Sequence, residues 1–575
     1  MKNVFTVFLI SFLILINSNE VLCQSYFYVS SSGGSDTNSG LTPSYAWQTL
    51  VRVNQGIDSE EINSSDFILF KNGDTWKNQS LDLTKDTSSP EYLTITTYTD
   101  DLNKAIFDGN SLNNIGITIK SKGIKIENIE IRNYQKDGIN ADVGNNNDLS
   151  IVIDNVYVHH NGSVNDGELN FGIYLAGSNS IIRNSIIELN RNDGVFSQGN
   201  SLLIDNNYFD RNGTESAIGD QLQIKNTNVF TISNNRFNHF DNDKGIIQAR
   251  FDSNHNGIFE YNTIDGNNLA YYGINMGGDG KIRFNRISNI IGGAGIRLPG
   301  NKNEVYSNLI ENCKDGISID RFNDQPHEIY NNTLVDCFYS GMKLGSTTQV
   351  NVIAKNNIIY SNLDGSFSLF ISEETSSYEG DNNLFYSDKF YRGDITYNSL
   401  SDWQAELFFD LNSINSNPLF QNSGSDPYSL SASSLAINNG QTLAPEFAKD
   451  ILGNVRGLYG NWDIGAYEYV GANKIININH TVLNSFVLTQ NYPNPFNPAT
   501  TINFSLAADS KVSLKIFDVI GQEVAQLVNG QLAAGQHNVN FDASSLNSGV
   551  YFYKIEANGV DGTSYSSVKK MILTK

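Results

Sequence analysis

Apolar and polar residues alternate in one short, repeated pattern between positions 126 and 359: an apolar residue, polar residues that are usually asparagine, and an apolar residue again. Ten copies of this pattern begin at Ile126, Ile153, Ile182, Ile204, Ile232, Phe259, Ile282, Val305, Ile329 and Ala354. The copies lie 22 to 29 residues apart, and between most of them a glycine introduces a second short apolar segment. Strands this short bury a face only when each copy stacks on the next, so the pattern predicts a β-solenoid.

The asparagines of this repeat keep one register. Seven successive copies carry asparagine in the same slot, at Asn207, Asn235, Asn262, Asn285, Asn308, Asn332 and Asn357. We expect each of them to adopt left-handed backbone geometry at a tight bend and to hydrogen-bond the amide of its neighbour one coil away. The alternative, that asparagine only marks loops, does not explain one register over seven copies.

The repeat resembles the right-handed parallel β-helix family, whose members include pectate lyases and other polysaccharide-active proteins. The resemblance implies an all-β fold, a right-handed parallel β-helix solenoid of about ten or more coils over residues 126–375. Residues 24–125, with Ala46-Trp47-Gln48-Thr49-Leu50, resemble the N-terminal cap and first coils of such proteins. Residues 376–470, which include Asp463-Ile-Gly-Ala-Tyr-Glu468, resemble their closing segment, where we expect Asp450 and Asp463 to be structural.

The last part of the chain has a different pattern. After a polar linker at residues 471–485, residues 486–575 alternate apolar strands with Gly and Asn turns, which predicts a small C-terminal β-sandwich. The amino-acid sequence from Phe486-Val-Leu-Thr-Gln-Asn-Tyr-Pro-Asn-Pro-Phe-Asn-Pro498 onward resembles the type A C-terminal sorting domain of the type IX secretion system. That resemblance implies passage through the type IX secretion machinery, followed by release or by attachment to the outer-membrane surface.

Residues 1–23 read as a secretory signal peptide, because Lys2 precedes an apolar run over residues 4–16 that is too short to span a bilayer. A lipidated Cys23 is less favoured, since Leu22 replaces the small residue expected before it. We predict no transmembrane segment and a monomer. A net charge of −23 argues against nucleic acid as a partner. Cys313 and Cys337 should stack on adjacent coils, either as a disulfide or as two inward-facing thiols.

The strands that follow the glycines should present rows of outward side chains, because alternate residues of a strand face opposite sides. One expected row reads Asn140, Tyr174, Phe196, Gln223, Ile247, Asn275, Arg297, Ser318 and Lys343. A neighbouring row includes Asp142, Gln198, Lys225 and Asp320, and just ahead lie Asp193, Asp220, Lys244 and Tyr272. The cations of this band are unusual on so acidic a chain; they are Lys225, Lys244, Arg250, Arg297 and Lys343. The aromatic rings of the band, Tyr174, Phe196 and Tyr272, are suited to stacking on sugars. The band predicts a groove for a polysaccharide, and the alternative is a solvated face with scattered charges.

Two reactions suit such a groove. A lyase needs a base beside the uronate carbon and a cation on the carboxylate, whereas a glycoside hydrolase needs two carboxylates across the bond. The segment from Asp220 through His239 to Lys244 resembles a pectate-lyase run with a substrate-binding lysine. Arg297-Leu-Pro-Gly-Asn-Lys302 resembles that family's Arg-x-Pro-x-x-Arg, whose first arginine is the base. Lys302 replaces the second arginine, and Arg297 lies two coils beyond Lys244 rather than one.

We therefore predict a secreted protein that cleaves an acidic, uronate-containing glycan by β-elimination. The alternatives are a non-catalytic glycan-binding or adhesin-like surface rod, and a glycoside hydrolase. The candidate catalytic residues are Lys244, Arg297, Asp220 and His239, and the candidate substrate-binding residues are Tyr174, Phe196, Gln223, Lys225, Arg250, Tyr272 and Asn275. No metal-ligand spacing is visible, although calcium is a possible cofactor because it would also neutralise a uronate.

Overall fold

The computed structural model describes residues 24–574 apart from 84–91, 100–102, 112–114, 145–146, 164–168, 214–218, 240–244, 251–255, 301, 322–324, 346–348, 373–375, 425, 459, 471–486, 492–493, 507–509, 533–534 and 560–563. The predicted signal peptide and most of the predicted linker lie outside the described residues. The chain divides into two compact units, Met1–Val470 and Gly471–Lys575.

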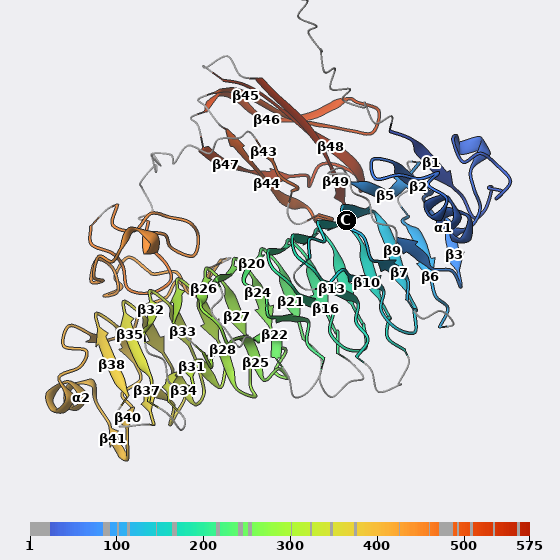
Figure 1. Cartoon of the computed structure of the whole chain (residues 1–575). Helices are drawn as coiled ribbons and strands as arrows, with labels where there is room; N and C mark the ends of the chain where they lie inside the picture. Colours follow the sequence, from blue (N-terminus) through green and yellow to red (C-terminus); the bar gives the residue numbers. More distant parts are fainter. Residues whose placement is uncertain are drawn as a thin grey trace, which may run out of the picture. The chain divides into compact units, whose positions relative to one another are not determined.

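The first unit is a β-helix with three sheets of 14 strands each, and successive coils add one strand to each sheet (Figure 1). Sheet A comprises β1 (Tyr26–Val29), β2 (Phe67–Lys71), β5 (Leu93–Tyr98), β8 (Ile124–Glu127), β11 (Ile151–Asp154), β14 (Ser180–Arg183), β17 (Leu202–Asp205), β20 (Val229–Ser233), β23 (Asn256–Glu260), β26 (Gly280–Arg283), β29 (Asn303–Tyr306), β32 (His327–Tyr330), β35 (Asn351–Lys355) and β38 (Ser377–Asp381). Sheet B comprises β3 (Thr75–Lys77), β6 (Ala105–Asp108), β9 (Ile129–Arg132), β12 (Tyr157–His159), β15 (Ile186–Glu188), β18 (Tyr208–Asp210), β21 (Arg236–Asn238), β24 (Thr263–Asp265), β27 (Arg286–Ser288), β30 (Leu309–Glu311), β33 (Thr333–Val335), β36 (Ile358–Tyr360), β39 (Leu384–Tyr386) and β42 (Ile414–Asn415). Sheet C comprises β4 (Leu81–Leu83), β7 (Ile117–Ile119), β10 (Ile139–Asp142), β13 (Ile173–Ala176), β16 (Val195–Gln198), β19 (Leu222–Lys225), β22 (Gly245–Arg250), β25 (Tyr272–Met276), β28 (Ala294–Leu298), β31 (Asp315–Ile319), β34 (Ser340–Leu344), β37 (Phe367–Ile371), β40 (Phe390–Arg392) and β41 (Ile395–Tyr397).

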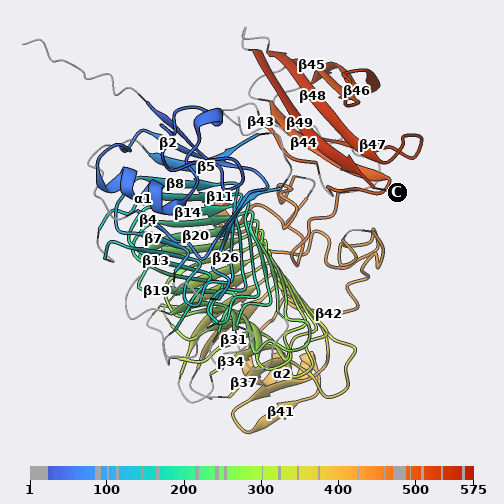
Figure 2. The ribbon, with the colours of Figure 1, turned by 90° about the vertical axis from the view of Figure 1, so that its right-hand side faces the viewer.

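Neighbouring strands pair in parallel along the sheets, and sheet C ends in the antiparallel pair β40 and β41. The predicted solenoid is therefore confirmed, and its strands extend past residue 375 to Asn415. Figure 2 shows helix α1 (Leu50–Asp58) at one end of the stack and helix α2 (Leu400–Leu407) at the other. In the part of the chain that the structure describes, no helix is long and apolar enough to cross a membrane.

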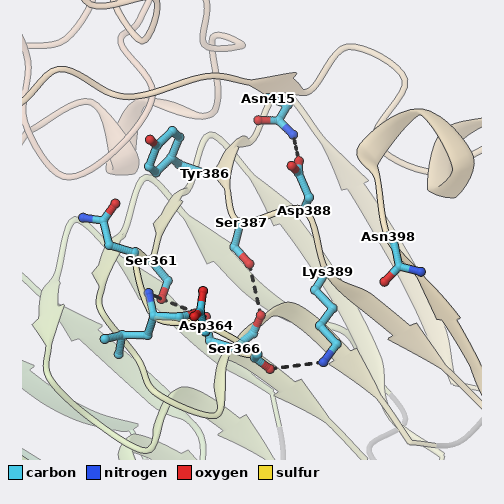
Figure 3. A pocket seen from close by; sticks show the side chains of 12 residues that line it. Ser361, Asp364, Ser366, Tyr386, Ser387, Asp388, Lys389, Asn398 and Asn415 are labelled. Atoms are coloured by element: carbon cyan, nitrogen blue, oxygen red, sulfur yellow. Dashed lines mark hydrogen bonds between the residues drawn. The ribbon is translucent and has the colours of Figure 1, made fainter.

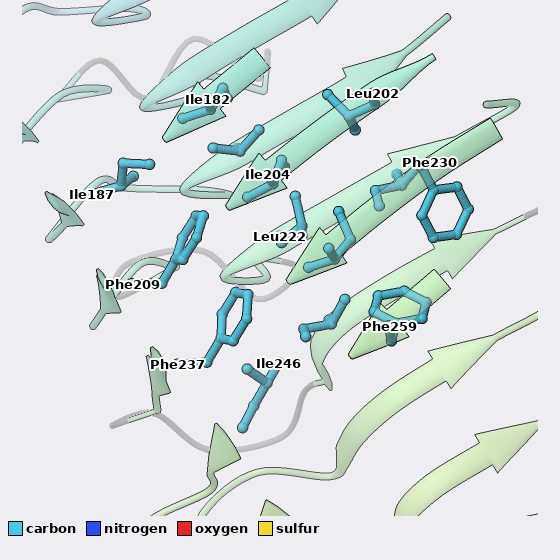
Figure 4. Close-up of a cluster of buried hydrophobic side chains, with 14 of the residues drawn as sticks. Ile182, Ile187, Leu202, Ile204, Phe209, Leu222, Phe230, Phe237, Ile246 and Phe259 are labelled. Carbon is cyan, nitrogen blue, oxygen red and sulfur yellow. The ribbon is translucent and has the colours of Figure 1, made fainter. Parts of the chain in front are cut away.

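The interior of the solenoid consists of columns of like side chains, because the parallel register repeats each inward position one coil later. Ile182 pairs with Ile204 on sheet A, and on sheet B the rings of Phe209 and Phe237 stack with centroids 4.6 Å apart (Figure 4). These side chains are fully buried. Truncation of such a residue to alanine typically costs about 2–5 kcal/mol of stability, so the columns hold the coils in register.

The asparagine ladder lies at the turn from sheet A to sheet B. The amide of each ladder asparagine donates to the side-chain oxygen of the next, as from Asn262 to Asn285 and from Asn285 to Asn308, both at 3.0 Å. The expected left-handed geometry, however, belongs to the preceding residue: φ is 57° at Tyr261 and 59° at Phe284. The ladder asparagine itself must turn inward to reach its neighbours, so the turn places the positive φ one residue earlier.

The glycines that precede the strands of sheet C are required by close approach between coils. A Cβ at Gly172 would lie 2.5 Å from the carbonyl oxygen of Gly194 and 2.7 Å from Nδ2 of Asn190. Asn190 belongs to a second, shorter asparagine ladder at this corner, which the sequence analysis did not predict. Its Nδ2 donates to Asn212 Oδ1 at 2.9 Å. Glycine therefore leaves room for this ladder.

Both ends of the solenoid are covered. At the N-terminal end, the 3-10 helix η1 (Pro43–Tyr45) and α1 flank the fully buried Trp47, and the Thr49 side chain caps α1 by accepting from the amide of Arg52. At the other end, Trp403 of α2 is fully buried and stacks on Phe390 with centroids 5.3 Å apart, whereas residues 416–470 pack along the flank formed by sheets A and B. Phe447 of the 3-10 helix η2 (Pro445–Phe447) lies 4.9 Å from the Tyr306 ring.

The closing segment carries a buried ion pair, in which Arg456 Nη1 lies 3.5 Å from Glu468 Oε2. The Asp450 carboxylate accepts from three backbone amides, those of Leu452, Asn454 and Glu468, and Asp463 accepts from those of Asn438 and Tyr469. These bonds fix the loops of the segment, which agrees with the structural role expected for the two aspartates.

Cys313 and Cys337 are both buried as free thiols, and their Sγ atoms donate to the carbonyl oxygens of Glu311 and Val335. The open question between a disulfide and inward-facing thiols is therefore answered in favour of the thiols.

The second unit is a two-sheet antiparallel structure, as its alternating strands predicted. One sheet has the order β43 (Val487–Leu488), β44 (Ala499–Leu506), β47 (Gly535–Asp542), and the other the order β46 (Glu523–Leu532), β45 (Ser510–Phe517), β48 (Gly549–Gly559), β49 (Ser564–Leu573). Leu514, Tyr553 and Phe504 belong to its buried core.

Candidate functional site

The outer face of sheet C, called here the groove face, presents the predicted row of side chains. The strand register aligns Asn140, Tyr174, Phe196, Gln223, Gln248, Asn275, Arg297, Ser318, Lys343, Phe370 and Tyr391. The prediction was wrong at one position: Ile247 is fully buried and pairs with Leu222, and Gln248 holds the outward slot. The count from Gly245 fell one residue short because Ile246, rather than a glycine, takes the register slot that Gly273 occupies in the next coil.

Three aromatic rings form a platform at the N-terminal part of the groove face. Phe196 stacks on Tyr174 and Phe171 with centroid distances of 5.7 and 5.0 Å. Gln198 Nε2 donates to the Tyr174 hydroxyl at 2.7 Å, and burial raises the pKa of Tyr174. Tyr174 and Phe196 were predicted, and Phe171 was missed because it precedes its glycine. Phe171 and Phe196 are buried, so the half-buried Tyr174 is the ring of this group that offers surface to a sugar.

Asp220 lies beneath this face rather than on it. The residue is fully buried, its amide donates to Asp193 Oδ1 at 2.7 Å, and its Oδ1 accepts from Gln248 Nε2 at 2.9 Å. Gln223 is the register partner of Gln248 and is half-buried. The arrangement makes Asp220 a group that orients Gln248, because its own carboxylate does not reach the surface.

Arg297 is the centre of a polar cluster on β28 and β31. Its Nε donates to Asp320 Oδ2 at 2.5 Å, and its guanidinium lies 4.9 Å from the centre of the Tyr272 ring. Ser318 Oγ donates to the other oxygen of Asp320 at 2.9 Å. Burial raises the pKa of Tyr272 to about 12, against the opposing charge of Arg297. Arg297 is therefore held in place and remains a quarter exposed.

Two further groups lie near Arg297: Asp315 was not predicted as a site residue, whereas Asn275 was predicted to bind substrate. Asp315 is buried, accepts from Ser340 Oγ at 2.6 Å, and has a pKa raised by burial, with Asp320 adding and Lys343 opposing. Asp315 occupies the same position of the repeat as Asp193 in an earlier coil, and each aspartate directly precedes a glycine. This recurrence could have identified Asp315 from the sequence. Asn275 is paired in register with Arg297, and among the described residues its buried Oδ1 accepts no hydrogen bond.

The remaining predicted residues are not gathered at this cluster. His239 follows β21 of sheet B and is buried, so it is not one of the outward residues of the groove face. Lys244 lies outside the described residues. Lys225 is exposed and its register partner is Arg250, which places the two backbones side by side on adjacent coils. Among the described residues, no three His, Cys, Asp or Glu side chains form a group that could hold a metal ion.

The cations of sheets A and C differ in their pairing. On sheet A, Arg183 pairs with Asp154 at 2.7 Å and Lys281 with Glu304 at 2.7 Å. On the groove face, Lys225 and Lys343 form no ion pair within the described part of the chain. Within the described residues, the groove face therefore carries two lysines whose charge no ion pair matches directly, although Lys343 acts at longer range on Asp315.

Two family models match parts of the chain. The right handed beta helix region matches residues 245–414, and the secretion system C-terminal sorting domain matches residues 490–574. With the three parallel sheets, the first match identifies the solenoid as a right-handed parallel β-helix. The second identifies the β-sandwich as a sorting domain of the type IX system, so the chain is a secreted protein. No curated protein matches the chain.

Solved structures with a similar fold are distant. A family 6 polysaccharide lyase from Pseudopedobacter saltans is 17% identical over 59% of this chain and 92% of its own, with a TM-score of 0.47. A family 136 lacto-N-biosidase from Eubacterium ramulus is 15% identical over 57% of this chain and 68% of its own, with a TM-score of 0.45. A pectate lyase is 14% identical over 78% of this chain and 96% of its own, with a TM-score of 0.35. At these values the likenesses carry no information on reaction or substrate.

Proposed function

We propose that the groove face binds an acidic, uronate-containing polysaccharide and cleaves it by β-elimination. The observation that supports this most directly is that Lys225 and Lys343 form no ion pair among the described residues, on a chain of net charge −23. An acidic glycan would supply the missing negative charge. From β13 to β37 the face runs over eight strand steps, roughly 38 Å, which is long enough for an extended oligosaccharide.

In the proposed reaction, one uronate residue lies over β25, beside Tyr272 and Asn275. The Arg297 guanidinium pairs with the uronate carboxylate and stabilises the negative charge that develops when the α-proton leaves. Asn275, the register partner of Arg297, would donate from its Nδ2 to the same carboxylate. A base takes the proton from C5, the C4–O4 bond breaks as the C4=C5 double bond forms, and O4 takes a proton as it leaves.

The roles of acid and base follow from position. Tyr272 remains protonated at neutral pH, since burial raises its pKa to about 12, and it is our candidate for protonating O4. Lys244 is our candidate base. It lies outside the described residues and directly precedes β22 in the sequence, and β22 is two strand steps, roughly 10 Å, from β28, which carries Arg297. The half-buried Tyr174, supported from beneath by the buried Phe196, would hold a sugar further along the polysaccharide.

Hydrolysis is the second candidate, and one observation favours it. Asp315 has a raised pKa while Asp320 accepts hydrogen bonds from Arg297 and Ser318, so one carboxyl is poised as an acid and the other as a base. Two carboxyl groups in different environments are what a glycoside hydrolase requires.

The test is incubation of the secreted protein with several uronate polymers, with and without calcium. β-Elimination gives unsaturated products that absorb in the ultraviolet, whereas hydrolysis gives new reducing ends without that absorption. We expect ultraviolet-absorbing products, and their loss in Lys244→Ala and Arg297→Ala. The matched control is Arg183→Ala, which removes a similar ion pair from sheet A.

Each outcome separates the candidates. Reducing ends without absorption, abolished by Asp315→Asn, would establish hydrolysis in place of elimination. Retention of glycan with no product under any condition would leave a glycan-binding surface rod. Full activity in Arg297→Ala would remove the proposed site even if the reaction were correct.

The sorting domain bears on where this activity takes place. We propose that the exported protein stays attached to the outer surface, where a depolymerase would release fragments close to the cell. Fractionation of cells expressing the tagged protein tests this, because release alone would place it in the culture medium. Protease treatment of intact cells should remove a surface-attached form.

A further inference from the structure

A polar cavity of about 430 Å³ opens near the last coils of the solenoid, and its lining does not include Arg297 (Figure 3 shows the lining residues). Its walls are two successive turns from sheet B to sheet C, residues 361–366 and 387–389, together with Asn398 and Asn415. The volume is in the range of small-molecule sites and suits about one or two sugar rings. Leu363 is the one aliphatic side chain larger than alanine in its lining.

The walls of the cavity are held by hydrogen bonds between the two turns. Ser387 Oγ donates to the carbonyl oxygen of Ser366 at 3.1 Å, and the backbone amide of Ser361 donates to the carbonyl oxygen of Tyr386 at 3.2 Å. Within the first turn, Ser366 Oγ donates to Ser361 Oγ at 2.8 Å. The cavity therefore has its shape before any ligand binds, which lowers the entropic cost of binding.

An aromatic ring and several hydroxyl and amide groups meet in this cavity. Tyr386 is half-buried and stacks on Tyr360, with centroids 5.1 Å apart and planes 10° apart, so the ring is fixed in orientation. Figure 3 shows Ser361, Ser387 and Asn398 around the same space. A flat ring beside groups that both donate and accept hydrogen bonds matches the two faces of a sugar, one apolar and one hydroxylated.

The charges of the cavity disfavour an acidic ligand. Asp364 and Asp388 are exposed at the cavity, against a single lysine. That lysine, Lys389, donates to the carbonyl oxygen of Gly365 at 3.4 Å and lies 4.4 Å from the centre of the Phe367 ring, so its charge is already shared. Carboxylates accept hydrogen bonds from neighbouring hydroxyls but repel a uronate.

We propose that this cavity is a second binding site, specific for a neutral, hydroxyl-rich sugar residue. Tyr386 supplies the stacking surface, and Asp364 and Asp388 accept from sugar hydroxyls. Phe367, beside Lys389, belongs to the groove face, where Phe370 stacks on Tyr391 at 4.3 Å. The site would thus hold a neutral unit or branch at the end of the groove, and it does not depend on cleavage taking place.

The experiment is titration of the full-length protein with neutral tetrasaccharides, namely gluco-, manno-, xylo- and galacto-oligosaccharides, by calorimetry and saturation-transfer NMR. We expect binding of at least one of them, and a loss of affinity of about tenfold or more in Asp364→Ala and in Tyr386→Ala. Asp394→Ala is the matched control, because Asp394 is an exposed turn aspartate at the same end of the solenoid but outside the cavity.

Several results would overturn the proposal. The first is that none of the neutral tetrasaccharides binds. The second is that Asp364→Ala and Asp394→Ala reduce binding equally. The third is that uronate oligomers bind and displace the neutral sugar from the same residues. Calcium titration is a further arm, and calcium binding that Asp364→Ala abolishes, without sugar binding, would replace the sugar with a cation. Because no cleavage is measured, a failed lyase assay leaves these outcomes unaffected.

Discussion

Replacement of Asn285 by alanine tests whether the asparagine ladder stabilises the stack of coils. The Asn285 side chain is fully buried and makes five hydrogen bonds. Its Nδ2 donates to the carbonyl oxygens of Phe259 and Arg283 and to Asn308 Oδ1, all at 2.9–3.0 Å. Its Oδ1 accepts from the amide and from Nδ2 of Asn262, both at 3.0 Å.

Alanine removes the acceptor and leaves two buried donor hydrogens of Asn262 without it. A buried donor that loses its partner costs about 1–3 kcal/mol, so we expect the free energy of unfolding to fall by about 2–6 kcal/mol. Asn228→Ala is the matched control: Asn228 is exposed at a turn of the same solenoid, and a surface substitution of this kind changes stability by no more than about 0.5 kcal/mol.

The assay is urea denaturation followed by tryptophan fluorescence, since Trp47, Trp76 and Trp403 are fully buried in the solenoid. A fall of less than about 1 kcal/mol in Asn285→Ala would refute the reasoning, because a buried network cannot lose an acceptor so cheaply. An equal loss in Asn228→Ala would point to a general intolerance of the turns and not to the ladder.

Three further predictions follow from charges and thiols. Burial raises the pKa of Glu468 from 4.5 to about 7; the charge of Asp463 adds to this rise and that of Arg456 opposes it. The folded state therefore holds the Glu468 proton more tightly than the unfolded state, and this stabilisation is fully present below pH 4.5 and is lost as the pH rises through 7. We expect this group to lower the free energy of unfolding by about 3 kcal/mol over that interval, and Glu468→Gln to flatten that part of the pH profile in urea titrations; an unchanged profile would contradict it. Burial raises the pKa of Cys313 to about 12, and both cysteines are free, so a thiol reagent should label neither in the folded chain lacking residues 1–23 and two in urea; none in urea would mean a disulfide. Affinity for uronate oligomers should fall about tenfold or more between low and high salt while affinity for a neutral tetrasaccharide stays constant, and equal salt dependence would place both on one site.

Much of the solenoid could be predicted from sequence because its physical constraints are periodic. The Asn ladder, the glycines and the inward isoleucines each repeat once per coil, so one alignment fixes the register of a whole sheet. Where the repeat loses its marker the prediction fails, as at Ile246, which takes the place of glycine and shifts the count that put Ile247 outside. Tyr261 and Phe284 show the same limit, since their positive φ follows from the inward turn of the next residue.

The candidate site was less predictable, because burial and pairing depend on neighbours in other coils. Asp220 is in the expected slot, but Gln248 covers it, and only the coordinates reveal that contact. Arg297 is on the expected row, yet its position depends on Asp320 one coil later. Asp315 could have been found from the Asp-Gly slot that it shares with Asp193. The cavity at residues 361–366 could not, because it is formed by two turns that have no pattern in common.

The location of the groove follows from what covers the other two sheets. The closing segment packs on residues of sheets A and B, among them Tyr306, Tyr330 and Leu309, and its apolar cluster contains no residue of a sheet C strand. The outer cations of sheet A are matched by acids, as Arg183 is by Asp154. Sheet C has half-buried rings, at Tyr174, Tyr272, Phe370 and Tyr391, and its Lys225 and Lys343 form no ion pair among the described residues. The half-buried and exposed positions of sheet C are where an external ligand would make contact, and among them Arg297, which Asp320 holds in position, is the residue whose loss should matter most.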